Sequence, residues 1–281
     1  MLSIEALIEA ALQEDVGSGD ITSLAVSATQ KYAHGRCILK DTGVLAGVQW
    51  AEKVYRLIDS GVTFEKHMSD GERFSSGQIA FEVYGKAYTL LVGERLVLNL
   101  LQRLSGIATL TRRYVEAVAG TPCHILDTRK TTPLWRALEK WAVQIGGGVN
   151  HRLGLYDQFL IKDNHIDLAG GVAPAIEAVL RYKEAQGLSA PIVVEVRNLP
   201  EIHAALGYAD RIDRLLLDNF RPDQVARAVE YIGGRLPVEV SGGITPENAR
   251  AYAEAGAQYI SAGSLTHSAR ALDISLKIRP A

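Results

Sequence analysis

The chain has 281 residues, 47% of them hydrophobic and 22% charged, with a formal net charge of −2. That length suffices for one large α/β domain or two smaller domains. A near-neutral chain argues against nucleic acid or an anionic membrane as its main partner, because both usually require a broad basic face. Cys37 and Cys123 form no C-x-x-C or Cys/His cluster, so we expect neither a disulfide framework nor a structural zinc, and a reducing compartment is the simplest location.

The first part of the chain predicts a small α+β unit. Residues 1–17 place apolar residues at helical spacing, interrupted by acidic ones that no secretory or membrane segment would tolerate, so we expect an amphipathic surface helix in a cytoplasmic protein. Apolar runs that predict strands follow at 21–26, 34–40, 43–49 and 74–85, with a helical stretch at 50–59. Residues 93–118 then predict two helices, broken near Ser105-Gly106.

After Gly120 the sequence alternates regularly between strand-like runs and helical patterns. The runs lie at 123–127, 158–162, 192–196, 214–218, 237–241 and 259–263, and their ends are separated by roughly 22 to 34 residues, the length of successive βα units. We therefore expect six parallel strands in series. Pro133 and Pro246 are each expected in the first turn of a helix, and the final stretch 268–281 should return as a strand to the N-terminal unit.

A concentrated positive charge lies between Arg129 and Lys162. Six lysines and arginines oppose only Glu139 and Asp157, a local excess of about four positive charges beside the three glycines 146–148. Cations next to consecutive glycines indicate a small anionic ligand. The glycines are equally compatible with a helix C-cap and loop, but His151-Arg152 directly after them favours a ligand loop.

Polar residues stand at or just beyond the C-terminal ends of the predicted strands. They are Asp127, Arg129, Lys130, Lys162, Glu195, Asp218, Ser241, Gly242, Gly243, Gly263 and Ser264. In a (β/α) barrel these ends converge on the mouth that holds the active site, and loops after the last strands commonly bind phosphate. Each residue alone is compatible with a capping, salt-bridge or strand-end role, but together they predict one site. His165 and His267 lie close enough to it to be left undecided, whereas His34, His67, His124 and His203 show no partner pattern.

Several long motifs resemble the quinolinate phosphoribosyltransferase family, also called nicotinate-nucleotide pyrophosphorylase (carboxylating). The motifs are GDITS at 19–23, the stretches 93–109, 126–133 and 146–165, the strand-end Glu195 and Asp218, and SGGI at 241–244. The resemblance covers almost the whole chain. One departure is Pro133-Leu134-Trp135, where Pro-Gly often follows the threonines in the family.

The resemblance implies a reaction and an architecture. Quinolinate and phosphoribosyl pyrophosphate would give nicotinate mononucleotide, pyrophosphate and carbon dioxide with Mg²⁺, a step of NAD biosynthesis. The fold would be α/β, with an N-terminal α+β domain (1–106, joined by the strand 270–281) and an incomplete (β/α) barrel of six to seven parallel strands (107–269). The protein would be a homodimer in which Arg95 enters the neighbouring subunit's active site.

The resemblance also assigns roles to the residues at the strand ends. Arg129, His151 and Arg152 would hold the two carboxylates of quinolinate, with Arg95 from the partner. Lys130 and Lys162 would face substrate charge near the pyrophosphate, and Glu195 and Asp218 the ribose hydroxyls and hydrated Mg²⁺. The Ser241 and Gly263 loops would bind the 5′-phosphate. These residue types suit the chemistry, because planar arginines fix carboxylates in a bidentate manner.

Three alternatives remain open at this stage. A ModD-like paralogue would share the phosphoribosyl site but act on a different base. A barrel lyase would use Lys162 as a Schiff-base amine, and borohydride trapping with a carbonyl substrate would support it. A non-catalytic sensor of phosphorylated metabolites would gain nothing from Glu195 and Asp218, so these carboxylates favour catalysis.

Overall fold

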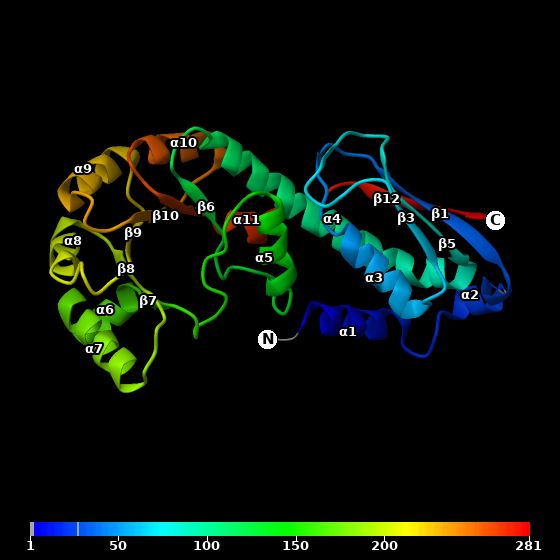
Figure 1. The fold of residues 1–281 in the computed structure, drawn as a ribbon, viewed down its shortest axis with the longest axis horizontal. Coiled ribbons are helices and arrows are strands. Elements are labelled where there is room, and N and C mark those ends of the chain that lie inside the picture. The colour runs from blue at the N-terminus through cyan, green and yellow to red at the C-terminus, as the bar shows by residue number, and fades with distance from the viewer. Residues whose placement is uncertain (1–2, 27) are drawn as a thin grey trace. The chain divides into compact units, whose positions relative to one another are not determined.

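A computed structural model describes residues 3–26 and 28–281, and these form two compact units (Figure 1). The first unit contains the chain up to residue 112 together with 131–147 and 264–281, and the second contains 113–130 and 148–263. Residues 131–147 thus pack with the N-terminal part of the chain. No helix among the described residues is long and apolar enough to cross a membrane.

The first unit is built on a four-stranded antiparallel sheet. Its strands, in spatial order, are β12 (Ile274–Pro280), β1 (Tyr32–Leu39), β5 (Ile79–Lys86) and β3 (Thr63–Lys66). A separate two-stranded sheet is formed by β2 (Gly43–Val44) and β4 (Arg73–Phe74). Alternate residues of β1 are buried, as expected for a sheet with one covered face. The last strand pairs with the first from Ala33 opposite Pro280 to Leu39 opposite Ile274, which confirms the predicted return of the C-terminus.

The first unit also contains several helices (Figure 1). They are α1 (Ile4–Val16), α2 (Ile21–Ala25), the 3₁₀ turn η1 (Ala28–Gln30), α3 (Val48–Ile58), most of α4 (Ala87–Ala117), α5 (Arg136–Ile145) and α11 (Ser264–His267). The predicted N-terminal helix is confirmed, and Ser3 caps it by accepting a hydrogen bond from the Ala6 N–H. Close packing joins α3 and α4, because a Cβ added to Gly93 would lie 2.7 Å from the Tyr55 ring.

Two predictions for the first unit were wrong. The run 21–26 is a helix rather than a strand, because the Asp20 carboxylate accepts the N–H groups of Thr22 and Ser23 and so starts a turn. The stretch 93–118 belongs to one continuous helix, α4, rather than two. Gly106 does not break it. A Cβ there would lie 2.1 Å from the Arg270 carbonyl oxygen, so this glycine permits a close backbone contact.

The segment before α5 also differs from its prediction. Pro133 lies outside the helix, which begins at Arg136, because Leu134 has a left-handed backbone (φ 66°) that no α-helix can contain. A side-chain contact holds this loop, since the Thr132 backbone N–H donates to Glu139 Oε2 at 3.0 Å. Gly146 is the C-cap of α5, so part of the glycine run does end a helix.

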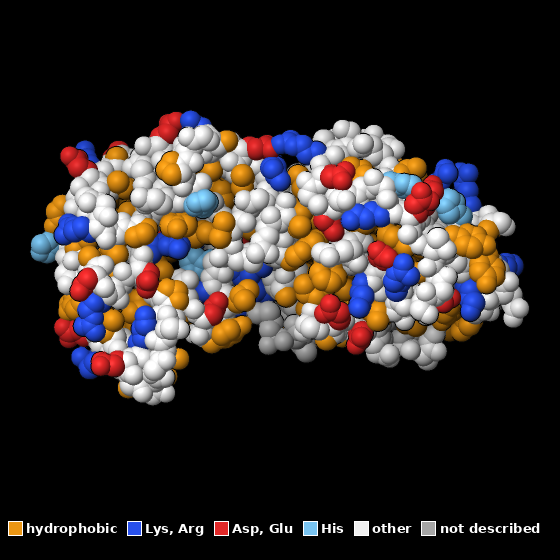
Figure 2. All heavy atoms as spheres, in the orientation of Figure 1, with side chains coloured by type: hydrophobic (Ala, Val, Ile, Leu, Met, Phe, Trp, Pro, Cys, Tyr) orange, Lys and Arg blue, Asp and Glu red, His pale blue; other side chains and the backbone are white. Residues whose placement is uncertain are grey.

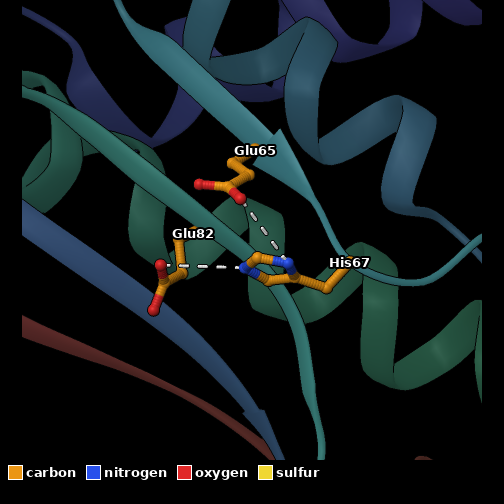
Figure 3. A group of neighbouring side chains, drawn as sticks. All are labelled: Glu65, His67 and Glu82. Atoms are coloured by element: carbon orange, nitrogen blue, oxygen red, sulfur yellow. Dashed lines mark ion pairs between the residues drawn. The ribbon is translucent and has the colours of Figure 1, made fainter.

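Figure 3 shows part of an ionic network of charged side chains: Glu65 on β3, Glu82 on β5, and His67, which directly follows β3. His67 lies between two carboxylates, with Nδ1 at 3.9 Å from Glu65 Oε1 and Nε2 at 3.7 Å from Glu82 Oε2, and His34 Nε2 is 3.5 Å from the same Glu82 atom. Their spacing would suit a metal ion. However, the Arg36 guanidinium already compensates Glu82 at 2.5 Å. We therefore interpret the group as an ionic network in which both histidines have partners.

The second unit contains a six-stranded parallel sheet and confirms all six predicted strands. In spatial order they are β6 (His124–Leu126), β11 (Tyr259–Ser261), β10 (Val238–Ser241), β9 (Arg214–Asp218), β8 (Ile192–Val196) and β7 (Phe159–Ile161). Val149 adds one further bridge beside Leu126 at the β6 edge. Within the described chain β6 and β7 are not paired with each other, so the barrel is incomplete, as predicted.

Helices connect these strands and lie outside the sheet (Figure 1). They are α6 (Asp163–Ala169), α7 (Val172–Ala185), α8 (Leu199–Leu206), α9 (Pro222–Ile232) and α10 (Pro246–Glu254). The predicted start at Pro246 is confirmed, with Thr245 as N-cap and the Asn248 side chain accepting the Thr245 N–H. On the face shown in Figure 2, basic and acidic side chains are interspersed, in keeping with the small net charge.

Candidate active site

The register of the parallel sheet places the predicted strand-end residues on one face. Ser241 is level with Asp218 on one side and Ser261 on the other, and Glu195 is level with Leu216, two residues before Asp218. Residues level in a parallel sheet point to the same face, as do residues two apart in one strand. The four polar side chains therefore share one face near the carboxyl ends of β8 to β11.

Two carboxylates and a lysine lie close together at this edge. Burial, followed by the neighbouring Asp218 carboxylate, raises the pKa of Glu195 above its usual value, while Lys162 acts in the opposite direction. The Asp163 backbone N–H, in the first turn of α6, donates to Glu195. Because like charges have been brought together in a half-buried place, this pair is suited to a divalent cation or to positive charge that develops on a substrate.

The end of β10 is tied to the end of β9, where the Asn219 N–H donates to the Ser241 carbonyl at 2.9 Å. The Ser241 hydroxyl donates to Asp218 Oδ1 at 3.0 Å, and Asn219 Nδ2 donates to Asp218 Oδ2 at 2.7 Å. Asn219 has a left-handed backbone (φ 58°), and a Cβ on Gly242 would lie 2.1 Å from its side-chain oxygen. Gly242 is thus required sterically. The sequence analysis missed Asn219, although Asp-Asn at the end of a strand is a recognisable sign of a left-handed turn.

Two arginines, Arg129 and Arg152, stand near each other in the same unit as these strands. Burial and then the adjacent Arg129 guanidinium lower the pKa of Arg152, and Asp157 opposes this shift. Arg152 is 9% exposed, and its NH1 donates to the Gln158 carbonyl at 3.2 Å. The Asp157 carboxylate holds the turn in place by accepting the backbone N–H groups of the two residues after Arg152. Two poorly hydrated guanidinium groups at short range complement a ligand with more than one negative charge.

His151 is anchored from three directions. Its backbone N–H donates to Oδ1 of the buried Asp127 at 2.8 Å, and its Nδ1 accepts the Arg152 N–H at 2.8 Å. Its Nε2 lies 3.4 Å from Oε1 of Glu239, a fully buried residue in the middle of β10. The other oxygen of Glu239 accepts from Arg214 NH1 at 2.8 Å. The sequence analysis missed Glu239 and Arg214, because it considered only the polar residues at the C-terminal ends of the apolar runs.

The remaining predicted residues lie as follows. Lys130 is exposed, and its backbone N–H donates to the Thr128 hydroxyl. Gly263 follows β11 and Ser264 begins α11. Arg95 is exposed on α4 in the first unit.

The two histidines left undecided both have protein partners. His165 accepts the Lys162 N–H through Nδ1 at 3.0 Å in the first turn of α6. His267 contacts the Ser268 hydroxyl.

An incomplete parallel barrel with paired arginines and paired carboxylates at its carboxyl edge defines an enzyme for small polyanionic substrates. The chain matches the family models for quinolinate phosphoribosyl transferase, with the N-terminal domain at residues 20–105 and the C-terminal domain at 107–277. The chain therefore belongs to the quinolinate phosphoribosyltransferase family, which confirms the resemblance in its motifs.

Known proteins agree with this assignment. The chain is 40% identical to quinolinate phosphoribosyltransferase [decarboxylating] 1b of Nicotiana tabacum, over 98% of this chain and 82% of that protein. It is also 40% identical to the probable nicotinate-nucleotide pyrophosphorylase [carboxylating] of Bacillus subtilis, over 99% and 94%. The crystal structure of NadC from Streptococcus pyogenes matches with a TM-score of 0.92 at 38% identity, over 100% of this chain and 99% of that one.

Proposed function

We infer that the chain transfers the phosphoribosyl group of phosphoribosyl pyrophosphate to quinolinate, releasing pyrophosphate and carbon dioxide and forming nicotinate mononucleotide for NAD biosynthesis. Family membership over nearly the whole chain supports this activity. The structural observation that carries it is the pair Arg129 and Arg152 in the same barrel unit as the pair Glu195 and Asp218. One pair suits a dicarboxylate, and the other suits a sugar that becomes cationic.

The arginine side of the site would bind quinolinate. We assign the two carboxylates to Arg129, His151 and Arg152. The lowered pKa of Arg152 reports repulsion between the guanidinium groups in addition to burial, and a bound dianion would relieve that repulsion. We further propose that the protein is a homodimer and that Arg95, exposed on α4, reaches the site of the partner subunit.

The carboxylate side would bind the ribose and the pyrophosphate. Carboxylate oxygens are the ligands that Mg²⁺ prefers, and the raised pKa of Glu195 beside Asp218 shows two oxygen donors whose repulsion a divalent cation would reduce. These residues therefore fit the ion, which when bound would neutralise charge on the departing pyrophosphate. Lys162 and Lys130 would add positive charge there.

The 5′-phosphate would lie at the loops Ser241–Gly243 and Gly263–Ser264. Positive φ angles at Gly242 and Gly243 (100° and 61°) turn the backbone in a way that side chains rarely permit. Such loops can bring N–H groups close to an anion. Hydrogen bonds of Ser241 with Asp218 and with the Asn219 N–H keep the first loop beside Asp218, which would place the phosphate and ribose subsites together.

The chemistry requires no protein nucleophile. The pyridine nitrogen forms the bond to the anomeric carbon while the carbon–oxygen bond to pyrophosphate breaks, and Glu195 and Asp218 stabilise the oxocarbenium-like positive charge between these events. The ring nitrogen is then cationic. Loss of carbon dioxide leaves an electron pair at ring carbon 2, next to that nitrogen, and this carbon then takes a proton.

The test is release of labelled carbon dioxide from quinolinate carrying the label in its 2-carboxylate. We expect release only when phosphoribosyl pyrophosphate and Mg²⁺ are both present. Turnover of another base without release would identify a ModD-like paralogue and overturn the assignment. Release without phosphoribosyl pyrophosphate would contradict the order of the two steps.

We also propose the cytoplasm as the location. Cys37 and Cys123 are both free and buried, and burial raises the pKa of each thiol to about 12. Neither thiol is therefore an oxidation-prone thiolate. Fractionation of cells that express a tagged chain tests the location, and accumulation in a membrane-bounded compartment would contradict it.

A further inference from the structure

We propose that Asn219 is a positioning residue for phosphoribosyl transfer: its side-chain amide holds the Asp218 carboxylate in the orientation in which that carboxylate faces the ribose of phosphoribosyl pyrophosphate. Asn219 acts through Asp218 and does not itself bind either substrate. The inference rests on the proposed function, because it concerns the ribose side of the same site.

Each oxygen of the Asp218 carboxylate accepts a hydrogen bond from a different side chain. The Ser241 hydroxyl donates to Oδ1 at 3.0 Å, and the Asn219 amide donates to Oδ2 at 2.7 Å. A carboxylate that is bonded through one oxygen alone can turn about its carbon–carbon bond, since that torsion has a broad energy profile. Donors on both oxygens fix its plane, and an ionised carboxylate keeps further lone pairs for ribose hydroxyls or a hydrated cation.

The left-handed backbone of Asn219 makes this contact possible. Consecutive residues of an extended strand point to opposite faces of the sheet, so the residue after Asp218 would ordinarily point away from it. Asn219 instead has a φ of 58°, and its backbone N–H donates to the Ser241 carbonyl at 2.9 Å. Asparagine tolerates this conformation because its short amide can form local hydrogen bonds. The turn thus directs the amide to the carboxylate of the preceding residue.

The amide of Asn219 lies against both Asp218 and Gly242. A Cβ on Gly242 would lie 2.1 Å from Asn219 Oδ1 and 2.8 Å from its Cγ, so the amide fills the space that the glycine leaves. The amide oxygen faces Gly242 and the nitrogen faces Asp218. The reverse orientation would set an oxygen without a proton against the Asp218 carboxylate, and the two would repel each other.

A turn alone does not account for an asparagine at this position. Glycine adopts positive φ angles without steric cost, and the described part of the chain has glycine at all such positions except Leu134 and Asn219. What asparagine adds to glycine is the amide, and this amide donates to a carboxylate of the proposed site. The added group therefore supports a role in positioning Asp218.

The first experiment compares Asn219→Gly with Asn219→Asp. Glycine suits the φ of 58°, so Asn219→Gly should keep the thermal unfolding midpoint of the wild type while it loses the amide. Aspartate keeps the shape of the side chain but replaces the donor by an oxygen that cannot donate. We expect both variants to lower kcat/KM for phosphoribosyl pyrophosphate about tenfold, the size of effect expected when a hydrogen bond to a charged group is lost.

Two outcomes of this comparison would overturn the proposal. A wild-type kcat/KM in Asn219→Asp would show that only the shape of the side chain matters. An equal loss of folded protein in both variants would assign Asn219 to the stability of the fold instead.

Binding of phthalate, a ring dicarboxylate without the reacting nitrogen, is the matched control. Its dissociation constant should stay within about twofold of wild type in both variants, since phthalate belongs to the arginine side of the site. A loss of phthalate affinity as large as the loss for phosphoribosyl pyrophosphate would indicate a general disturbance of the site and contradict a specific effect on Asp218.

A double substitution tests whether the effect passes through Asp218. In an Asp218→Asn background, Asn219→Gly should raise the dissociation constant of phosphoribosyl pyrophosphate by no more than about twofold further. A further tenfold rise would mean that Asn219 acts on the substrate by itself, against the proposal.

Crystal structures provide a readout independent of turnover. The Asp218 carboxylate should be rotated or disordered in Asn219→Gly, and a carboxylate in its wild-type orientation would refute the role of the amide. Failure of the wild type to release carbon dioxide from quinolinate would instead refute the proposed function, and the orientation of Asp218 in the two structures would still decide the role of Asn219.

Discussion

Replacing Arg129 by alanine tests the dicarboxylate clamp most directly. An ion pair with a desolvated carboxylate that loses one partner costs about 2 to 5 kcal/mol. This structure favours the lower end of that range. Arg129 and Arg152 repel each other, as the lowered pKa of Arg152 shows, so removing one of them relieves the other. We therefore expect a loss of about 2 to 3 kcal/mol, or roughly 30- to 150-fold in the dissociation constant of the dicarboxylate.

The assay is calorimetric titration of Arg129→Ala with phthalate, alongside KM for quinolinate. Arg129→Lys is the matched control, because it retains the charge but loses the planar two-point geometry. We expect the lysine variant to recover only part of the lost affinity. An alanine variant with unchanged affinity for phthalate, or a lysine variant equal to wild type, would refute the clamp.

The remaining predictions concern other parts of the chain. Glu195→Gln should lower kcat at least about 100-fold with little change in KM for quinolinate. Because the pKa of Glu195 is raised, its carboxylate should become protonated at a higher pH than that of an ordinary glutamate, and kcat should fall with it as the pH is lowered. The same loss of kcat at low pH in the Gln variant would contradict this assignment. Mixing inactive Arg95→Ala and Lys162→Ala subunits should restore part of the activity in hybrid dimers, and no recovery after verified subunit exchange would argue against a shared site. Gly106→Ala should lower the free energy of unfolding by about 1 to 3 kcal/mol, measured by urea titration, since its Cβ would meet the Arg270 carbonyl; an unchanged midpoint would show that the contact yields freely.

The barrel strands and the residues at their ends could be predicted from the sequence. Buried parallel strands are short apolar runs spaced by helices, and the active site of a barrel is built at their carboxyl ends, so charged residues there stand out in the sequence. Glu195 and Asp218 were found in this way, and the register confirms that they share a face. The arginine and histidine roles came from the family motif, and they remain predictions.

Local patterns in the first unit were less reliable. The run 21–26 contains β-favouring residues, but the Asp20 cap determines a helix there. Gly106 has the composition of a helix break, yet its purpose is contact with a carbonyl more than 160 residues later, which no local window contains. The left-handed backbone of Leu134 likewise lies in a loop that is held by the hydrogen bond between Thr132 and Glu139, seven residues apart in the sequence.

The sequence by itself thus determined the family, the number and order of the barrel strands, and the charged residues at the strand ends, because these depend on short-range pattern and on residue chemistry. Only the tertiary structure revealed that Glu239 lies 3.4 Å from His151 and that the Asn219 N–H donates to the Ser241 carbonyl at 2.9 Å, since both contacts join residues from different strands or loops. A buried glutamate inside an apolar run has no distinguishing local sign. Its surroundings are known only from its partners, His151 and Arg214, which come from other parts of the chain.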